Sequence, residues 1–366
     1  MAPEIGVCRT GQRLPPRRMP RLSTQLVLAL AAVAAMTAAA APRGSPPPQP
    51  PLHLSETGLY VDATTRAVDP RNLPYSPQYP LWSDGADKSR WIFLPPGTAI
   101  DARDPESWVF PIGTKLWKEF SWRGKRVETR LLQRTRAGWT YSTYEWNEAG
   151  SDADLVPADG APSRHLLAPG RPHLIPSVAD CKDCHENGRS EVLGFSALQL
   201  SPDRDPLAPH AEPLRPGDLT LTALVERRLL RGLPLAVSGT APRIAAASPR
   251  GRAALGYLHA NCGICHHPAA PLASIGLFLR HSLSAHDPSK EPAAGAIGHP
   301  SAYGSPPPTG NLFWIAAGDP DRSAVVTRMA SRSPAAQMPP LGTQLVDEDA
   351  VALLTAWIRE DLPPDR

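Results

Sequence analysis

Two neighbouring stretches decide the fold of the first half of the chain: Lys115-Leu-Trp-Lys-Glu-Phe-Ser-Trp122 and Arg126-Val-Glu-Thr-Arg-Leu-Leu-Gln133. Both stretches are rich in aromatic, apolar and β-branched residues mixed with polar ones at a period near two, a pattern typical of strands that bury one face. Between them, Trp122-Arg-Gly-Lys125 favours a tight hairpin turn. The sequence therefore predicts an antiparallel β-rich domain over residues 52–175. Similar runs, bounded by Gly or Pro, lie at 90–94, 107–110 and 138–146.

The tryptophans support this reading of the first half. Seven of the nine in the chain fall within residues 54–172. Tryptophans in strands normally pack against a core, so we expect an aromatic core here. A face that binds sugars or a partner is the alternative.

Composition limits the possible folds and partners. The chain has 366 residues, of which 45 are prolines, and proline interrupts long helices and central strands. The formal net charge is +3, but the first 41 residues hold five arginines and one glutamate. Because that surplus is four, the remaining chain carries a net charge of −1. This balance argues against nucleic acid as a partner.

The N-terminal segment indicates export. Residues 17–21 read Arg-Arg-Met-Pro-Arg, and residues 22–41 are apolar and rich in alanine. A basic segment, an apolar segment and small residues in that order are typical of a secretory signal peptide. We therefore predict a signal peptide over residues 1–41, a periplasmic protein and a proline-rich linker over residues 42–51. A retained segment is the alternative, and membrane association is expected only in that case.

Four of the five cysteines form two pairs of equal spacing, each followed by a histidine: Cys181-Lys-Asp-Cys184-His185 and Cys262-Gly-Ile-Cys265-His266. This is the attachment motif of c-type haem. Two thiols one helical turn apart can add to the two vinyl groups of a porphyrin, and the next residue brings an imidazole to the iron. The sequence thus predicts two covalently attached haem c groups, with both histidines as iron ligands. The fifth cysteine, Cys8, precedes the apolar signal segment.

Other uses of paired cysteines fit less well. Disulfides are the first expectation in an exported chain, but they do not explain a histidine after each pair. A four-cysteine zinc site leaves both histidines unexplained in the same way. A thioredoxin-like redox pair needs a βαβ context, which the sequence pattern does not show.

The second motif has helical surroundings. Ser248-Pro249 favours a helix start, and residues 250–261 can run as a helix into the cysteine pair. Residues 347–359 carry an apolar stripe typical of another helix, and Gly256 would let a bulky residue such as Trp357 approach. This arrangement resembles the cytochrome c fold, in which the first and last helices cross at a small residue.

That resemblance implies a mainly α-helical, cytochrome c-like domain over residues 248–366 and a methionine ligand on a loop before the last helix. Met338, in Gln337-Met-Pro-Pro-Leu-Gly342, occupies this place. Thioether ligation raises the potential relative to two histidines. Met329 is expected in the core. The predicted fold class of the whole chain is α+β, with the β-rich domain preceding the helical one.

The first haem lacks an obvious sixth ligand. It belongs to a segment over residues 176–247, in which 218–231 has the pattern of an amphipathic helix. Since no free methionine lies near, the ligand is a histidine or the position is open. His210, on a proline-stiffened stretch, is the leading candidate. The other candidates are His259, His173 and His165.

Four further stretches carry a resemblance to a known family: Pro-Tyr-Ser-Pro-Gln-Tyr-Pro-Leu-Trp-Ser-Asp-Gly (74–85), Pro-Ile-Gly-Thr-Lys-Leu-Trp-Lys-Glu-Phe (111–120), Leu-Gly-Tyr-Leu-His-Ala-Asn-Cys (255–262) and Gln-Met-Pro-Pro-Leu-Gly-Thr (337–343). With the two cysteine motifs, the chain resembles the bacterial diheme c-type cytochromes of the Shewanella-type family, typically encoded beside a parallel β-helix repeat protein. The resemblance covers nearly all of the mature chain. It implies covalent haem at Cys181/Cys184 and Cys262/Cys265, with His185, His266 and Met338 on iron.

Three functions are compatible with these features. The leading one is a periplasmic carrier that transfers electrons between redox-partner proteins, among which the resemblance implies the parallel β-helix repeat protein. The runner-up is a diheme peroxidase-like enzyme with an open first haem. In the third, the β-rich domain binds polysaccharide and the haem part serves it.

Overall fold

The computed structural model describes residues 49–62, 65–188, 190–283, 292–301, 303 and 312–364. All of them belong to one compact unit, Pro47–Arg366. The predicted signal peptide and most of the predicted linker lie outside the described residues. None of the helices formed by the described residues is long and apolar enough to cross a membrane.

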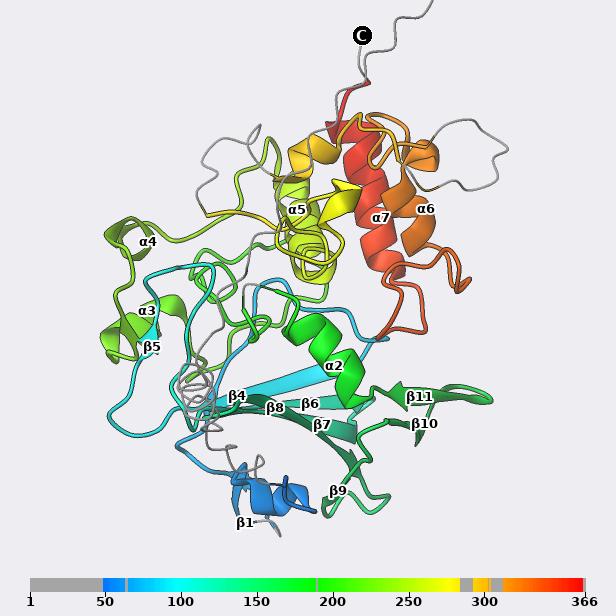
Figure 1. The fold of residues 1–366 in the computed structure, drawn as a ribbon. Helices are drawn as coiled ribbons and strands as arrows, with labels where there is room; N and C mark the ends of the chain where they lie inside the picture. The colour runs from blue at the N-terminus through cyan, green and yellow to red at the C-terminus, as the bar shows by residue number, and fades with distance from the viewer. Residues whose placement is uncertain are drawn as a thin grey trace, which may run out of the picture. The chain divides into compact units, whose positions relative to one another are not determined.

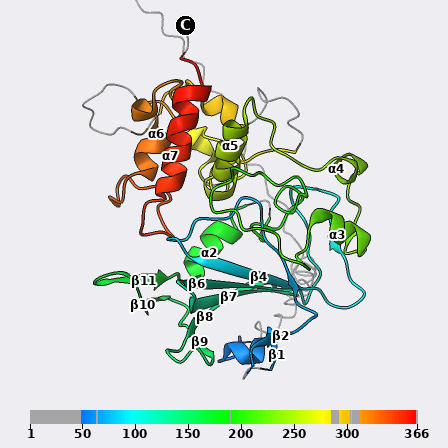
Figure 2. The same ribbon diagram turned by 180° about the vertical axis from the view of Figure 1, so that it is seen from behind.

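A six-stranded antiparallel sheet is the largest regular element of this unit (Figures 1 and 2), with strand order β3-β4-β6-β7-β8-β9. The strands predicted at 115–122, 126–133 and 138–146 are confirmed, and the turn after Trp122 is a hairpin in which Arg123 and Gly124 both have positive φ, 51° and 75°. Positive φ at both positions suits the right-handed twist of the flanking strands. The strand bounds are β3 Leu73–Pro74, β4 Asp87–Phe93, β6 Lys115–Trp122, β7 Lys125–Thr135, β8 Gly138–Trp146 and β9 Ala153–Leu155.

Three two-stranded pairs complete the β structure. β1 (Tyr60–Asp62) pairs with β2 (Ala67–Val68), and β10 (Ala161–Ala168) pairs with β11 (Arg171–Ile175), both antiparallel. β5 (Ile100–Asp101) and β12 (Leu230–Arg231) pair in parallel across a long stretch of sequence. The run at 107–110 was wrongly predicted as a strand, since it contributes only an isolated bridge between Val109 and Asp101.

The sheet separates two apolar clusters because successive side chains point to opposite faces. One face packs Trp117, Leu131 and Tyr144 against Leu54 of the short 3-10 turn η1 (Leu54–Thr57). This confirms that the tryptophans of the strands build a core. The opposite face carries Ile92, Leu116 and their partners, which are Phe195, Leu200 and Leu224.

Six α-helices occur among the described residues, all short, at 5 to 13 residues. The last three pack together beyond the sheet (Figures 1 and 2), around Leu258, Trp314 and Leu354. The helix bounds are α2 Val178–His185, α3 Leu221–Glu226, α4 Leu235–Gly239, α5 Pro249–Asn261, α6 Ala324–Met329 and α7 Glu348–Ala356. Shorter helical turns are η2 Ala273–Ile275, η4 Pro292–Ala296, η5 Pro320–Arg322 and the π-turn η6 Trp357–Asp361.

The predicted fold class is therefore wrong. The described residues of the segment expected to be a mainly helical cytochrome c-like domain form three α-helices of 13, 6 and 9 residues, joined by turns and irregular chain. Its prolines limit helix length, since Pro334, Pro339 and Pro340 all fall between α6 and α7. The helix predicted at 218–231 is likewise reduced to α3, because Arg228 has a φ of 57° and the chain then enters β12. The apolar pattern showed which face is buried but not how far each helix runs.

The close approach predicted at Gly256 involves a different ring. An added Cβ at Gly256 would lie 2.0 Å from Cε1 of Tyr79, whereas Trp357 meets α5 at Gly251, with 3.1 Å between an added Cβ and Nε1. Tyr79 is 2% exposed, and its hydroxyl lies 3.0 Å from Oδ2 of Asp205. The pairing of Gly256 with Trp357 is therefore wrong, and Gly256 fits α5 against the segment that leads into β4.

We expect Gly256→Ala to lower the free energy of unfolding by about 1–3 kcal/mol, because the buried ring of Tyr79 blocks the new methyl group. This is the net loss that remains after the gain of about 1 kcal/mol that alanine normally brings to a helix. Urea denaturation measures the difference. Gly239→Ala, where an added Cβ meets nothing within 4 Å, is the control and should not destabilise. An unchanged midpoint for Gly256→Ala would contradict the packing described here.

Candidate functional site

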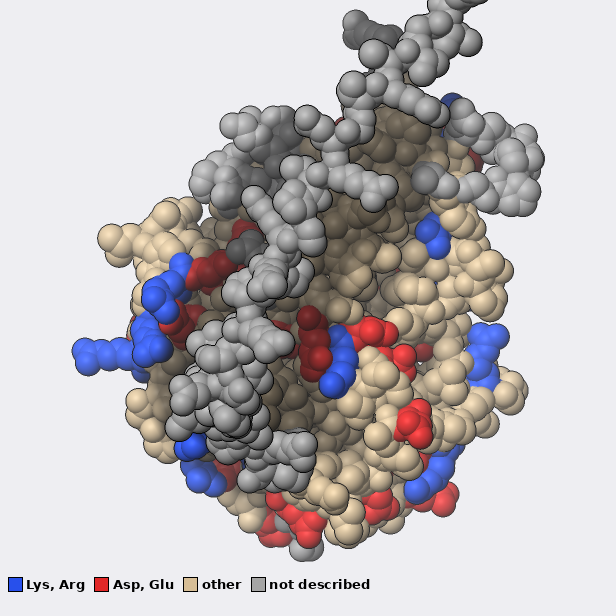
Figure 3. All heavy atoms as spheres, in the orientation of Figure 1, with Lys and Arg blue, Asp and Glu red and all other residues tan. Residues whose placement is uncertain are grey.

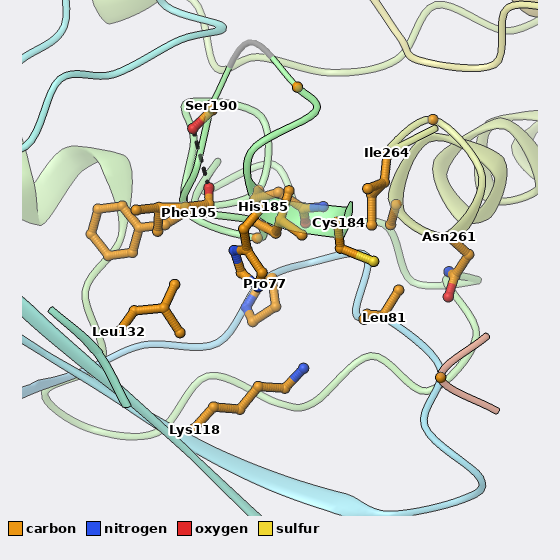
Figure 4. A pocket seen from close by; sticks show the side chains of 18 of the residues that line it. Pro77, Leu81, Lys118, Leu132, Cys184, His185, Ser190, Phe195, Asn261 and Ile264 are labelled. Atoms are coloured by element: carbon orange, nitrogen blue, oxygen red, sulfur yellow. Dashed lines mark hydrogen bonds between the residues drawn. The ribbon is translucent and has the colours of Figure 1, made fainter. Parts of the chain in front are cut away.

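A cavity of about 270 Å³ that opens to solvent lies over one face of the sheet. Its walls come from the sheet, from the first cysteine motif and from the second. Figure 4 shows Lys118 rising from the sheet toward Cys184 and His185 on the other side.

Helix α2 presents the first motif to this cavity. Ser177 caps the helix: its hydroxyl accepts the N–H of Asp180 at 3.1 Å, and it donates to the Asp180 carboxylate at 2.7 Å. Such a capping box fixes where a helix begins. Cys181 and Cys184 then lie one turn apart, and both line the cavity. In Figure 4 the sulfur of Cys184 points into the open space.

His185 is held in one orientation by its neighbours. Its Nδ1 lies 2.6 Å from the carbonyl oxygen of Glu191, and its ring packs against Tyr141 with the centroids 5.4 Å apart. A nitrogen that donates to a carbonyl carries the hydrogen, so the lone pair is on Nε2. Burial, joined by the charges of Lys118 and Arg130, lowers the pKa of His185 to about 4 despite the hydrogen bond to Glu191. The imidazole is therefore neutral at physiological pH, the state that binds iron.

The second motif is also wound into a helical turn. Cys262 ends α5, and the N–H groups of Cys265 and His266 donate to its carbonyl at 3.1 and 2.9 Å. Cys265 lines the cavity, close enough to Cys184 to raise the pKa of that thiol, whereas Cys262 and His266 lie outside the lining. Burial lowers the pKa of His266, and the charge of Arg328 adds to this. The structure thus brings the two motifs, distant in sequence, to one cavity.

Burial raises the pKa of all four cysteine thiols of the two motifs. All four are free. Burial raises the pKa of Cys184 to about 11 and that of Cys262 to about 12, whereas catalytic thiol pairs have a lowered pKa. Within the described part of the chain, no three His, Cys, Asp or Glu side chains are grouped so as to hold a metal ion.

Met338 lies on a loop that reaches the cavity. Its N–H donates to the carbonyl of Arg328 at 3.0 Å, and the residues that follow it, from 339 to 343, form part of the cavity wall. Met329 is 4% exposed and belongs to the core around α5 and α7, as predicted. The structure places the predicted ligand loop at the same cavity as Cys265. Met338 as an iron ligand remains a prediction.

The candidate histidines for the first haem are engaged elsewhere. His210 lies outside the cavity lining, with its Nε2 2.9 Å from Asp347. His259 lines the cavity, but its Nδ1 accepts the N–H of His281 at 3.0 Å. Its hydrogen is then on Nε2, which leaves no lone pair for a metal. Outside the lining, His173 contacts Glu128 at 3.3 Å and His165 stacks on Trp122.

Sequence reasoning missed several cavity residues. His281 lines the wall, and three basic side chains, Arg90, Lys118 and Arg130, lie on its floor. The alternation of side chains along each strand could have shown which face of its strand each of these three residues occupies. It could not show that the three strands pair in a register that brings the charges together, which depends on tertiary structure.

No known protein family, curated protein or solved structure matches this chain. The resemblance to the diheme cytochromes therefore remains a prediction from the sequence motifs. The evidence for function from the described residues is the geometry of the cavity and of the two cysteine motifs.

Proposed function

We propose that this protein is a periplasmic diheme c-type cytochrome that transfers electrons between redox-partner proteins. The observation that carries the proposal is that both Cys-x-x-Cys-His motifs form helical turns and contribute residues to the lining of one cavity. Cys181, Cys184 and His185 would hold one haem, and Cys262, Cys265 and His266 the other. A bound c-type haem supplies a one-electron iron couple whose potential depends on its axial ligands and surroundings.

The residues around the first motif fit such a group. The hydrogen bond of His185 Nδ1 to Glu191 leaves Nε2 for iron, an arrangement typical of haem and metal ligands. The thiols are free and protonated, so that they are not committed to a disulfide or to thiolate chemistry. Residues of both motifs line the cavity, namely Cys181, Cys184 and His185 of the first and Cys265 of the second. We infer that the two haems lie near each other.

The proposed partners are redox proteins, and the family resemblance adds a parallel β-helix repeat protein. On the face drawn in Figure 3, the acidic and basic side chains of the described residues are interspersed over the surface. A nucleic-acid interface would instead gather the basic ones. The periplasmic location rests on the signal-like segment 1–41.

A peroxidase-like activity is the second candidate function. It is favoured by one observation: neither His210 nor His259 offers a free nitrogen to the cavity. An iron at His185 would then have an open position for a small substrate.

Electron paramagnetic resonance of the oxidised, haem-loaded protein distinguishes the two functions. Two low-spin signals are expected for an electron carrier, in which both irons have six ligands. A substantial high-spin signal would favour the peroxidase-like enzyme, and turnover of hydrogen peroxide by that sample would establish it.

Met338→Ala should convert one haem from low-spin to high-spin, because it removes the thioether proposed as the sixth ligand of the second iron. The midpoint potential of that haem should fall as well. Met329→Leu is the matched control, since Met329 is buried in the core and keeps its apolar volume in this variant. A Met338→Ala protein with the wild-type spectrum and potentials would exclude Met338 as a ligand.

A further inference from the structure

The floor of the cavity carries a row of three basic side chains. Arg90 of β4 lies directly opposite Lys118 of β6, and Lys118 lies directly opposite Arg130 of β7. All three line the cavity, so they share the same face of the sheet. Like charges directly opposite one another destabilise a sheet. We call these three residues the basic row.

The two outer members of the basic row have acidic partners. The Arg90 guanidinium lies 3.0 Å from the Glu212 carboxylate. The Arg130 guanidinium donates to Glu128, with Nε and Oε1 3.1 Å apart. The outer charges are thus compensated by residues of the protein itself.

The side-chain ammonium of Lys118, in the middle, has no hydrogen bond or ion pair with any described residue. Its ammonium lies 4.8 Å from the centroid of the Phe120 ring and points into the cavity (Figure 4). A cation without a partner at such a place is costly. The burial of Lys118 and the nearby charges of Arg90, Lys88 and Arg130 hold its pKa well below the ordinary value. An anion in the cavity would remove this cost.

We propose that the basic row, through Lys118, binds a carboxylate, and that this carboxylate is a propionate of the haem attached to Cys181 and Cys184. The inference rests on the proposed function. A haem carries its vinyl groups on one edge and its two propionates on another, so the thiols and the propionates contact different walls. Lys118 lies across the cavity from α2, which supplies the thiols (Figure 4).

The test is a redox titration of haem-loaded Lys118→Met over a range of pH. A nearby cation disfavours the more positive oxidised iron and the protonated propionate. The variant should therefore show a lower midpoint potential for one haem, and the pH at which this potential begins to change should move upward. Because the substitution removes a like charge from the basic row, we expect it to fold.

Two further variants make the test specific. Lys118→Arg keeps the charge and should retain the wild-type potentials. Lys115→Met removes a lysine of the same strand that points to the opposite face and donates to the carbonyl of Thr57 at 2.7 Å. It should leave both potentials unchanged. If Lys118→Met does not retain both haems, Lys118→Gln provides the same comparison.

Two results would overturn the inference, and they are distinguishable. Unchanged potentials and pH dependence in a charge-removing variant with two attached haems would reject the propionate contact and leave the proposed function standing. Wild-type protein without attached haem would reject the proposed function and the inference together.

Discussion

Replacement of both Cys181 and Cys184 by serine should halve the covalently bound haem, from two groups per chain to one. The two thiols lie one turn apart on α2 and line the cavity, and without them no covalent bond to the first haem can form. Intact-protein mass spectrometry and the pyridine haemochrome spectrum measure the loss. The haem at Cys262 and Cys265 should remain.

Cys8→Ser is the matched control, because Cys8 belongs to the predicted signal peptide. The control protein should carry two haems. Two haems on the double serine variant, or the loss of both, would show that the motifs do not act as two separate attachment sites.

Glu128→Gln should destabilise the protein by about 3 kcal/mol. Glu128 is fully buried. Its carboxylate compensates the charge of the Arg130 guanidinium and lies 3.3 Å from Nε2 of His173. Removal of one partner of a buried ion pair costs about 3–5 kcal/mol, and the partial exposure of Arg130 in the cavity places the expected loss at the lower end. Urea denaturation at neutral pH gives the difference.

The pH dependence provides a second readout of this pair. Burial favours the neutral form of Glu128. The interactions of the carboxylate with Arg130 and His173 outweigh this effect of burial and hold the pKa of Glu128 below its ordinary value. Its contribution is therefore complete above the unfolded pKa of about 4.3 and is lost as the pH falls through the lower folded pKa. The wild type should lose stability in this range, and Glu128→Gln should lose less.

Glu186→Gln is the control for the loss of a charge. Glu186 pairs with Lys182 at 3.9 Å on the exposed side of α2, and an exposed pair contributes about 0–1 kcal/mol. Equal effects of the two glutamate substitutions would contradict the role assigned to Glu128.

The parts of the fold that follow local rules could be predicted from the sequence. The hairpin at Trp122 follows from alternation and a glycine turn, and α5 begins at Pro249 because Ser248 caps it. The two Cys-x-x-Cys-His motifs were visible from spacing alone, and haem attachment to them remains a prediction. In each case neighbouring residues carry the information.

The parts that depend on distant residues could not be predicted. Gly256 faces Tyr79, which lies far away in the sequence, and not Trp357. The basic row exists only because β4, β6 and β7 pair in one register. The prediction of helix length was wrong for the same reason. The apolar stripe of 218–231 is divided between α3 and β12, and β12 pairs with β5, which precedes it by more than a hundred residues.

The mass of the mature wild-type protein, expressed for export in a host with a haem-attachment system, tests the central claim most directly. The account predicts a polypeptide with two haem groups that remain bound after acidic acetone extraction. A mature polypeptide of unmodified mass, with four thiols or two disulfides, would contradict it.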